Sequence, residues 1–168
     1  MARRLSRPDE RGDPPAVRTG ARVVSVNVSD TKGTRKHPVG RAVLVAGFGV
    51  EGDAHGGEWE RQVSLLARES VAKMPASGLD LAPGDFGENV TTAGIDLASL
   101  PVGSTLRLGA EAEIRVTQIG KECHLGCEIR RQVGDCVMPR EGIFARVTKA
   151  GTIAAGDPIE VPAVRKDP

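Results

Sequence analysis

The residues best suited to chemistry lie in the segment KECHLGCEI (121–129), where Cys123 stands between Lys121 and His124. A free thiol has a pKa of about 8.5, and adjacent cations or a helix N-terminus lower it. The sequence predicts a helix over 124–133, so all three influences would act on this thiol. We therefore predict that Cys123 is a reactive thiolate or a ligand for a soft, thiophilic metal.

Two other interpretations of the cysteines stay open. Free cysteines are often buried as small apolar side chains, which suits Cys127 and Cys136 better than Cys123 with its polar neighbours. Alternatively, the segment could bind zinc, although structural zinc sites normally have two closely spaced ligand pairs and this sequence offers one. The zinc ligands would then be chosen from Cys123, Cys127, His124, Cys136 and His55.

A second group of polar residues lies in turns distant from the cysteines. Glu88 and Asn89 belong to PGDFGENVT (83–91), where Asn and Asp commonly bond their own backbone. Arg61 opens the apolar run RQVSLL (61–66), where a charged residue is commonly a solvated edge. Together these residues offer carboxamide, guanidinium and backbone N–H donors, a combination that suits an anionic ligand with several polar groups.

The segment GFGVEG (47–52) matches the G-x-G-x-x-G pattern of dinucleotide-binding loops. In those loops a helix begins at the third glycine, because its N-terminus holds the pyrophosphate. Here DAHGGEWE (53–60) follows, with two more glycines and no helical periodicity, so we predict no dinucleotide site. The glycines form either a wide, mobile turn or a backbone that a bulky ligand can approach closely, with His55 in the same space.

Short apolar runs bounded by turn residues predict strands over most of the chain. Helical signals are limited to ARESVAKM (67–74) and to 124–133. Many short strands and 21 glycines indicate a mostly β fold, a barrel or sandwich with one or two short helices. The predicted strands are 22–28, 41–46, 61–66, 86–92, 105–109, 113–120, 143–150 and 157–161.

Composition limits the possible partners. A formal net charge of +1 gives no general attraction to nucleic acid or anionic membranes, and three Phe, one Trp and no Tyr leave few platforms for stacking bases. No apolar segment reaches the length of a membrane span, and no secretory signal follows the N-terminal arginines. Three cysteines do not make a disulfide framework, so we expect reduced thiols and a cytoplasmic protein.

The two ends of the chain differ in composition from its centre. Residues 1–19 are rich in Arg, Pro and acidic residues, which predicts a disordered tail. Residues 162–168 predict a frayed C-terminus. One domain over 20–161 remains, and it is long enough to bury a core of its own.

Seven segments, in order, resemble the MOSC domain, the module named after the C-terminal part of molybdenum-cofactor sulfurase. The resemblance spans residues 20–161 and is closest to small stand-alone bacterial members. It implies a MOSC-type β-barrel and a site for the molybdopterin-based molybdenum cofactor, or for persulfide sulfur on its way to that cofactor. The segments are VSVN (24–27), GVEGDAHGG (49–57), RQVSLL (61–66), LAPGDFGENVTT (81–92), LPVGSTLRLG (100–109), IGKECH (119–124) and GIFARV (142–147).

For individual residues, the resemblance implies a pocket in which Cys123 is a molybdenum ligand or a sulfur carrier. Arg61 would be a natural partner for the pterin phosphate. The chain has no room for a pyridoxal-phosphate desulfurase domain, so no pyridoxal phosphate of its own is expected. The expected cofactor-binding residues are His55, Arg61, Glu88, Asn89, Lys121 and His124.

The first functional hypothesis is an accessory protein that binds the molybdenum cofactor or carries sulfur, with a sulfur donor or cofactor-biosynthesis proteins as partners. The alternative is a small molybdenum-dependent reductase of N-hydroxylated compounds with an external electron donor. Glu122 before the cysteine and His124 after it depart from the pattern of the reductases and favour the first hypothesis. A zinc-stabilised interaction module is a third, non-enzymatic option.

Overall fold

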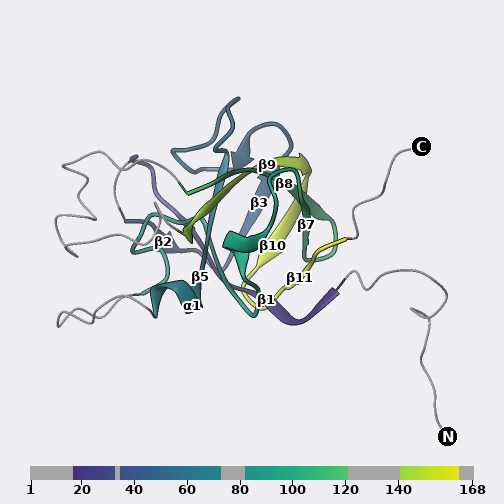
Figure 1. Cartoon of the computed structure of the whole chain (residues 1–168). Coiled ribbons are helices and arrows are strands. Elements are labelled where there is room, and N and C mark those ends of the chain that lie inside the picture. Colours follow the sequence, from purple (N-terminus) through teal and green to yellow (C-terminus); the bar gives the residue numbers. More distant parts are fainter. Residues whose placement is uncertain (1–16, 33–34, 73–81, 121–140, 163–168) are drawn as a thin grey trace, which may run out of the picture.

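A computed structural model describes residues 17–32, 35–72, 82–120 and 141–162 (Figure 1). Most of these residues are in strands, with one helical turn, α1 (Arg68–Val71), and one 3-10 turn, η2 (Leu97–Ser99). The strands are β1 (Val17–Val28), β2 (His37–Pro38), β3 (Arg41–Val45), β4 (Gly49–Val50), β5 (Val63–Ala67), β6 (Val90–Ala93), β7 (Thr105–Leu108), β8 (Ala112–Ile119), β9 (Ile143–Lys149), β10 (Gly151–Ala154) and β11 (Pro158–Glu160).

Seven strands close a barrel in the order β1-β11-β7-β8-β9-β5-β6, and β6 pairs with β1 again. The described pairs are antiparallel except for β5 with β6, in which Leu65 lies beside Val90. A parallel pair brings the beginnings of both strands to the same edge of a sheet. The residues just before β5 and just before β6 therefore meet at one end of the barrel.

A second sheet, with the order β10-β3-β4, accompanies the barrel. Its strand β4 leads into the glycine-rich loop that carries His55. A Cβ atom added to Gly49 would lie 2.6 Å from the carbonyl oxygen of Gln62, a separation that real Cβ atoms do not show. Gly49 also has a positive φ of 128°, so a glycine is needed here and the loop starts pressed against the residues before β5.

Aliphatic side chains fill the interior of the barrel. In β7, Leu106 and Leu108 are buried and alternate with partly exposed neighbours, and β8 continues the alternation with Ile114 and Val116. Full burial of such a side chain stabilises the fold by about 1.5–3 kcal/mol. Sheet closure and aliphatic packing thus replace the aromatic residues that this chain largely lacks.

The prediction of a mostly β barrel with few helices is confirmed. Strands form within or across the predicted runs, and α1 is the beginning of the predicted helical stretch 67–74. No helix opens at Gly52, as expected from the rejection of a dinucleotide loop, because residues 51–52 form a turn. The helix predicted over 124–133 lies outside the described residues.

Three details differ from the prediction. β1 begins at Val17, earlier than the expected strand start at 22 and inside the segment 1–19. The expected strand 86–92 is reduced to β6, because positive φ angles at Gly84 and Gly87 shape a turn ahead of it. The short strands β2, β4 and β10 were not predicted, since two to four residues give too little periodicity to recognise.

In the part of the chain that the structure describes, no helix has both the length and the apolar character needed to cross a membrane.

Candidate functional site

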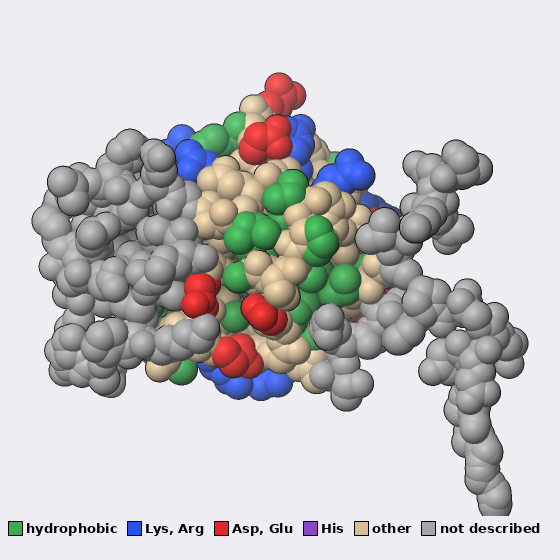
Figure 2. All heavy atoms as spheres, viewed as in Figure 1, with side chains coloured by type: hydrophobic (Ala, Val, Ile, Leu, Met, Phe, Trp, Pro, Cys, Tyr) green, Lys and Arg blue, Asp and Glu red, His purple; other side chains and the backbone are tan. Residues whose placement is uncertain are grey.

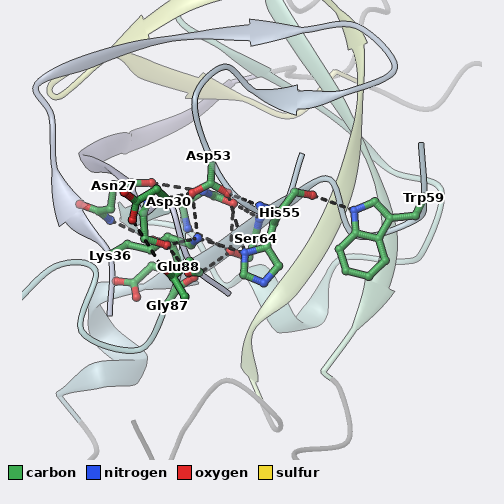
Figure 3. A network of polar contacts seen from close by, with 12 residues as sticks. Asn27, Asp30, Lys36, Asp53, His55, Trp59, Ser64, Gly87 and Glu88 are labelled. Carbon is green, nitrogen blue, oxygen red and sulfur yellow. Dashed lines mark hydrogen bonds and ion pairs between the residues drawn. The ribbon is translucent and has the colours of Figure 1, made fainter. Parts of the chain in front are cut away.

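The turn 84–89 and the loop 51–62 lie at the end of the barrel where β5 and β6 begin. Asn89 donates its backbone N–H to the carbonyl oxygen of Ser64 at 2.9 Å, which joins the turn to β5. Ser64 in turn lies beside Phe144 of β9. Polar residues that are far apart in the sequence, among them Asn27, Asp53 and Glu88, thereby come together (Figure 3).

Glu88 is fully buried, and its carboxylate accepts hydrogen bonds from three donors. The backbone N–H groups of Gly84 and Phe86 donate at 2.9 and 3.2 Å, and the hydroxyl of Thr91 donates at 2.7 Å. Burial raises the pKa of Glu88, while these hydrogen bonds oppose the rise. The carboxylate therefore shapes the turn that precedes β6.

Asn89 is also fully buried and links three strands. Its Oδ1 accepts from the backbone N–H and the hydroxyl of Ser64 at 3.0 and 3.2 Å. Its Nδ2 donates to the carbonyl oxygen of Asn27 in β1 at 3.2 Å. Asn27 reciprocates by donating its own side-chain amide to the carbonyl oxygen of Glu88 at 3.1 Å. We call Asn27, Ser64, Glu88 and Asn89 the buried polar scaffold.

Lys36 is packed tightly against this scaffold. Its backbone N–H donates to the carbonyl oxygen of Gly84 at 2.8 Å. A Cβ atom at Gly84 would lie 2.2 Å from the carbonyl oxygen of Lys36, and Gly84 has a φ of +91°, so this position requires glycine. The close approach places the ammonium group of a buried lysine beside the loop that carries His55.

Lys36, Asp53 and His55 form a polar cluster (Figure 3). The Lys36 ammonium lies 2.8 Å from Asp53 Oδ1 and 3.1 Å from His55 Nδ1, and the side chains of the ion pair are wholly inaccessible to solvent. Asp53 Oδ2 accepts the backbone N–H of His55 at 3.0 Å. The His55 side chain is 27% exposed, so this imidazole connects a buried ion pair with the protein surface.

The protonation of Asp53 follows from this environment. Burial alone would raise the pKa of its carboxyl group. The hydrogen bond and charge of Lys36, with the backbone N–H groups of Ser29 and His55, outweigh burial and hold the pKa below its ordinary value of 3.8. Asp53 is therefore ionised at neutral pH and balances the buried ammonium.

Arg61 lies among aromatic rings at the surface end of the site. Its guanidinium carbon is 4.7 Å from the centre of the Trp59 ring and 5.7 Å from that of Phe144. The Trp59 ring also stacks on His55, with centroids 6.2 Å apart, and lies 5.2 Å from the Lys32 ammonium. We call Lys32, Trp59, Arg61 and Phe144 the cation–aromatic cluster.

The guanidinium of Arg61 is not paired with a carboxylate or a hydrogen-bond acceptor among the described residues. The nearby Arg146 differs, because it lies 3.6 Å from Glu60 and donates to the carbonyl oxygen of Trp59 at 3.3 Å. Stacking on aromatic rings holds a guanidinium in place while leaving its N–H groups available. Such a group suits the recognition of a phosphate or carboxylate.

A sequence model of the MOSC domain matches residues 51–160, which is more than half of the chain. The chain belongs to the MOSC domain family. The match includes the loop 51–62, the turn 84–89 and both strands that border the segment 121–140. No match was found among curated protein sequences.

Solved structures have the same fold as this MOSC domain. YuaD from Bacillus subtilis is similar with a TM-score of 0.71 and 22% identity, over 86% of this chain and 97% of that one. YiiM from Geobacillus stearothermophilus gives 0.66 and 22%, over 85% and 75% of the two chains. YiiM from Escherichia coli gives 0.61 and 23%, over 92% and 73%.

Several predicted site residues of this MOSC domain come together. His55 and Arg61 both contact the ring of Trp59. Glu88 and Asn89 belong to the buried polar scaffold. As cofactor contacts all four remain predictions. The remaining predicted residues lie outside the described part of the chain; they are Lys121, Cys123 and His124.

The segment with Cys123 leaves and rejoins the barrel close to the cation–aromatic cluster. Gly120 donates its backbone N–H to the carbonyl oxygen of Gly142 at 2.6 Å, so the two borders of the segment are adjacent. Phe144, whose ring contacts Arg61, follows Gly142 by two residues. The segment therefore begins and ends beside a member of the cluster.

Sequence reasoning missed Lys36, Asp53 as its partner, and the role of Trp59. A lysine in KHPVG (36–40) looks like an ordinary surface residue, and its ion pair joins residues 17 positions apart. The one available signal was Trp59 itself, the single Trp of the chain, two residues before Arg61. Its position in a glycine-rich, polar loop is unusual for so large an apolar side chain.

Another concave region is a poor candidate for an anion site. A hollow of about 330 Å³ beside α1 is lined by Glu69, Asp96 and Glu141, whose carboxylates would repel an anion. Figure 2 shows one group of acidic side chains near the lower centre of this face and another at its top, whereas Lys and Arg side chains lie towards its edges. Among the described residues, no group of three or more His, Cys, Asp or Glu could hold a metal ion.

Proposed function

We propose that this MOSC domain binds a molybdopterin-type cofactor, or carries sulfur for it, with Cys123 as molybdenum ligand or persulfide acceptor. The observation that supports this proposal best is the Arg61 guanidinium, stacked on Trp59 and Phe144 with no acidic partner among the described residues. A phosphorylated pterin is planar and anionic. It needs both properties of the cation–aromatic cluster, a positive charge and flat apolar rings.

The residues present fit such a ligand. Arg61 and Lys32 would bind the phosphate, and the ring edges of Trp59 and His55 would border the pterin. The buried polar scaffold, which contains Glu88 and Asn89, would hold these groups in place. When bound, the cofactor would supply a thiophilic metal centre with redox chemistry, for which a cysteine thiolate is a suitable ligand.

The position of Cys123 in the sequence supports its part in this proposal. Cys123 follows Gly120 by three residues, and three peptide units span at most about 11 Å. Gly120 borders the strand pair that carries Phe144. The thiol can therefore belong to the same site as Arg61 without any rearrangement of the barrel.

In the sulfur-carrying version, the thiolate of Cys123 attacks the outer sulfur of a persulfide on a donor. A new sulfur–sulfur bond forms on Cys123, the donor's sulfur–sulfur bond breaks, and the donor leaves as a thiolate. The exchange needs no external oxidant or reductant. It does need a reduced thiol, which agrees with a cytoplasmic location, and a sulfur donor or cofactor-biosynthesis protein as partner.

Titration with isolated molybdenum cofactor under anaerobic conditions tests the proposal. Arg61→Gln should weaken binding at least about tenfold, since a charge-assisted hydrogen bond contributes about 1.5–3 kcal/mol. Arg22→Gln is the matched control, because Arg22 is exposed and pairs with Ala93 at the far end of β6. Equal affinities for wild type, Arg61→Gln and Arg22→Gln would contradict the assignment of Arg61.

Mass spectrometry after incubation with a persulfide donor tests the role of the cysteine. We expect an added sulfur atom on Cys123, retained in Cys127→Ser and Cys136→Ser and lost in Cys123→Ser. If wild type stays unmodified but Cys123→Ser loses bound molybdenum, Cys123 is a ligand and not a carrier. If neither property depends on Cys123, its assignment is wrong.

A further inference from the structure

The orientation of the His55 ring is fixed from both sides. Its backbone N–H donates to Asp53 Oδ2 at 3.0 Å, and its carbonyl oxygen accepts from Trp59 Nε1 at 2.8 Å. The ring itself stacks nearly parallel on Trp59, with an angle of 5° between the planes. These contacts hold the Nδ1 edge of the imidazole towards Lys36.

The contact between Lys36 and His55 has a defined direction. An ammonium group has three protons and accepts no hydrogen bond. Among the described residues, three acceptors lie within reach of Lys36 Nζ: Asp53 Oδ1 at 2.8 Å, His55 Nδ1 at 3.1 Å and the Ser29 hydroxyl oxygen at 3.2 Å. His55 Nδ1 must therefore offer its lone pair to the lysine.

A protonated Nδ1 does not fit this arrangement. Two N–H donors would then face one another at 3.1 Å, and two positive charges would share one site. Asp53 Oδ2 lies 3.8 Å from Nδ1, within ion-pair distance, but this one carboxylate would then have to balance two cations, since it is already paired with Lys36 and accepts the His55 N–H. The next cation, Lys32, faces Trp59 and adds no partner for Nδ1.

We propose that the buried Lys36–Asp53 ion pair positions His55 as the neutral tautomer with its proton on Nε2, so that this residue offers the ligand a hydrogen-bond donor and not a base or a cation. Asp53 keeps Lys36 charged, and Lys36 in turn selects the tautomer. Lys36 and Asp53 are thus positioning residues. The donor role towards a ligand oxygen or nitrogen rests on the proposed function, whereas the tautomer does not.

The tautomer can be read directly from a long-range ¹H–¹⁵N correlation spectrum of the ligand-free, full-length chain at pH 7.5. The chain has three histidines, and loss of a signal set in His55→Gln and His124→Gln assigns them. His55 should have a pyridine-like Nδ1 and a protonated Nε2. His37, exposed in β2 and distant in sequence from the ion pair, is the internal control, and its signals should stay the same in every variant below. A protonated Nδ1 or a charged ring at His55 would overturn the proposal.

Matched variants test the cause of the tautomer. Lys36→Met with Asp53→Asn removes the ion pair without leaving one buried charge unpaired, and His55 should then show both tautomers. Ser29→Ala removes another partner of Lys36 and should leave the His55 signals within the range of wild type. An unchanged tautomer in a folded double variant would mean that the ion pair does not select it. If the double variant does not fold, the wild-type spectrum alone decides.

Addition of molybdenum cofactor tests the donor role separately. If the cofactor binds and the His55 Nε2–H signal shifts, the donor role is supported. If the cofactor binds and this signal does not move, the donor role is wrong while the proposed function stands. If no cofactor binds, the proposed function fails, and the tautomer measured without ligand is unaffected.

Discussion

The buried polar scaffold and the cation–aromatic cluster are neighbours, yet they satisfy their polar groups in opposite ways. In the scaffold, Glu88 and Asn89 are fully buried, and both carboxylate oxygens of Glu88 and both polar atoms of the Asn89 amide have hydrogen-bond partners. In the cluster, Arg61 is half-buried and rests on aromatic rings, with its N–H groups unpaired within the described residues. One region is complete without a ligand, and the other is not.

This difference distinguishes polar residues that hold the site together from polar residues that can bind a ligand. Polar residues that build the site need full pairing, because an unsatisfied buried group costs about 1–3 kcal/mol. Polar residues that bind a ligand need the reverse: their hydrogen-bonding groups are left without a partner in the protein, and packing holds them in position. His55 stands between the two regions, with Nδ1 used by the buried ion pair and its ring beside Trp59.

The largest effect should come from breaking the buried ion pair. Lys36→Met leaves Asp53 buried without its counter-charge, and we expect a loss of about 3–5 kcal/mol in the free energy of unfolding. Urea denaturation followed by circular dichroism measures it. The double variant with Asp53→Leu should recover part of the loss, because no charge then remains unpaired. A loss below about 1 kcal/mol for the single variant would show that the pair is not buried in solution.

A somewhat smaller loss should follow removal of the central carboxylate of the scaffold. Glu88→Ala leaves two backbone N–H groups and the Thr91 hydroxyl without their acceptor, so we expect a loss of about 3 kcal/mol. Glu111→Ala is the control, since Glu111 is exposed and should change stability by less than about 0.5 kcal/mol. Similar values for both variants would argue that Glu88 is not a structural group.

The two buried carboxyl groups should respond to pH in opposite directions. The raised pKa of Glu88 means that the folded state holds its proton more tightly, so its contribution is complete below 4.5 and is lost as pH rises through the folded-state pKa. The lowered pKa of Asp53 gives a contribution that is present above 3.8 and lost as pH falls through its folded-state pKa.

Stability curves against pH can separate these contributions. Above pH 4.5, wild type should lose stability relative to Glu88→Gln by up to about 1.4 kcal/mol per pH unit until the folded-state pKa is passed. Below pH 3.8, the free energy of unfolding of wild type should fall towards that of Lys36→Met, because Asp53 becomes protonated. Parallel curves for wild type and Glu88→Gln would show that burial does not shift the pKa of Glu88.

The smallest effect on stability should come from the cation–aromatic cluster. Arg61→Gln removes two cation–π contacts of a half-buried side chain, each of about 0.5–1 kcal/mol, and we expect a net loss of about 1 kcal/mol or less in the free energy of unfolding. The same variant should show a large loss of cofactor affinity, as proposed above. A loss of more than about 3 kcal/mol would place Arg61 with the scaffold and remove the contrast between the two regions.

The local alternation of apolar and polar residues was sufficient to predict the barrel strands. It was not sufficient to predict how the site residues are arranged. Alternation in 105–109 and 113–120 reports which side chains face the core, and both runs are strands. The burial of Lys36 depends on Asp53 and on the close approach of Gly84, and neither local hydrophobicity nor spacing encodes such long-range contacts. Glu88 and Asn89 shape a turn, as their sequence context predicts, and their role as cofactor contacts stays a prediction.

The composition also predicted few aromatic platforms for stacking. It could not predict that two of the few aromatic residues contact the same arginine. Trp59 and Phe144 lie 85 positions apart, yet both contact Arg61 because β9 pairs with β5 at Ser64. Counting residue types cannot show such convergence. The position of Cys123, which the sequence favoured most strongly, lies outside the described residues and stays a prediction.

The single Trp has a practical consequence. Since the chain has no Tyr, its near-ultraviolet emission comes almost entirely from one indole, that of Trp59. This indole stacks on His55 and contacts Arg61 and Lys32, so any change in their charge or distance alters its quantum yield and colour. The unlabelled protein therefore contains its own optical reporter, placed where the ligand is proposed to bind.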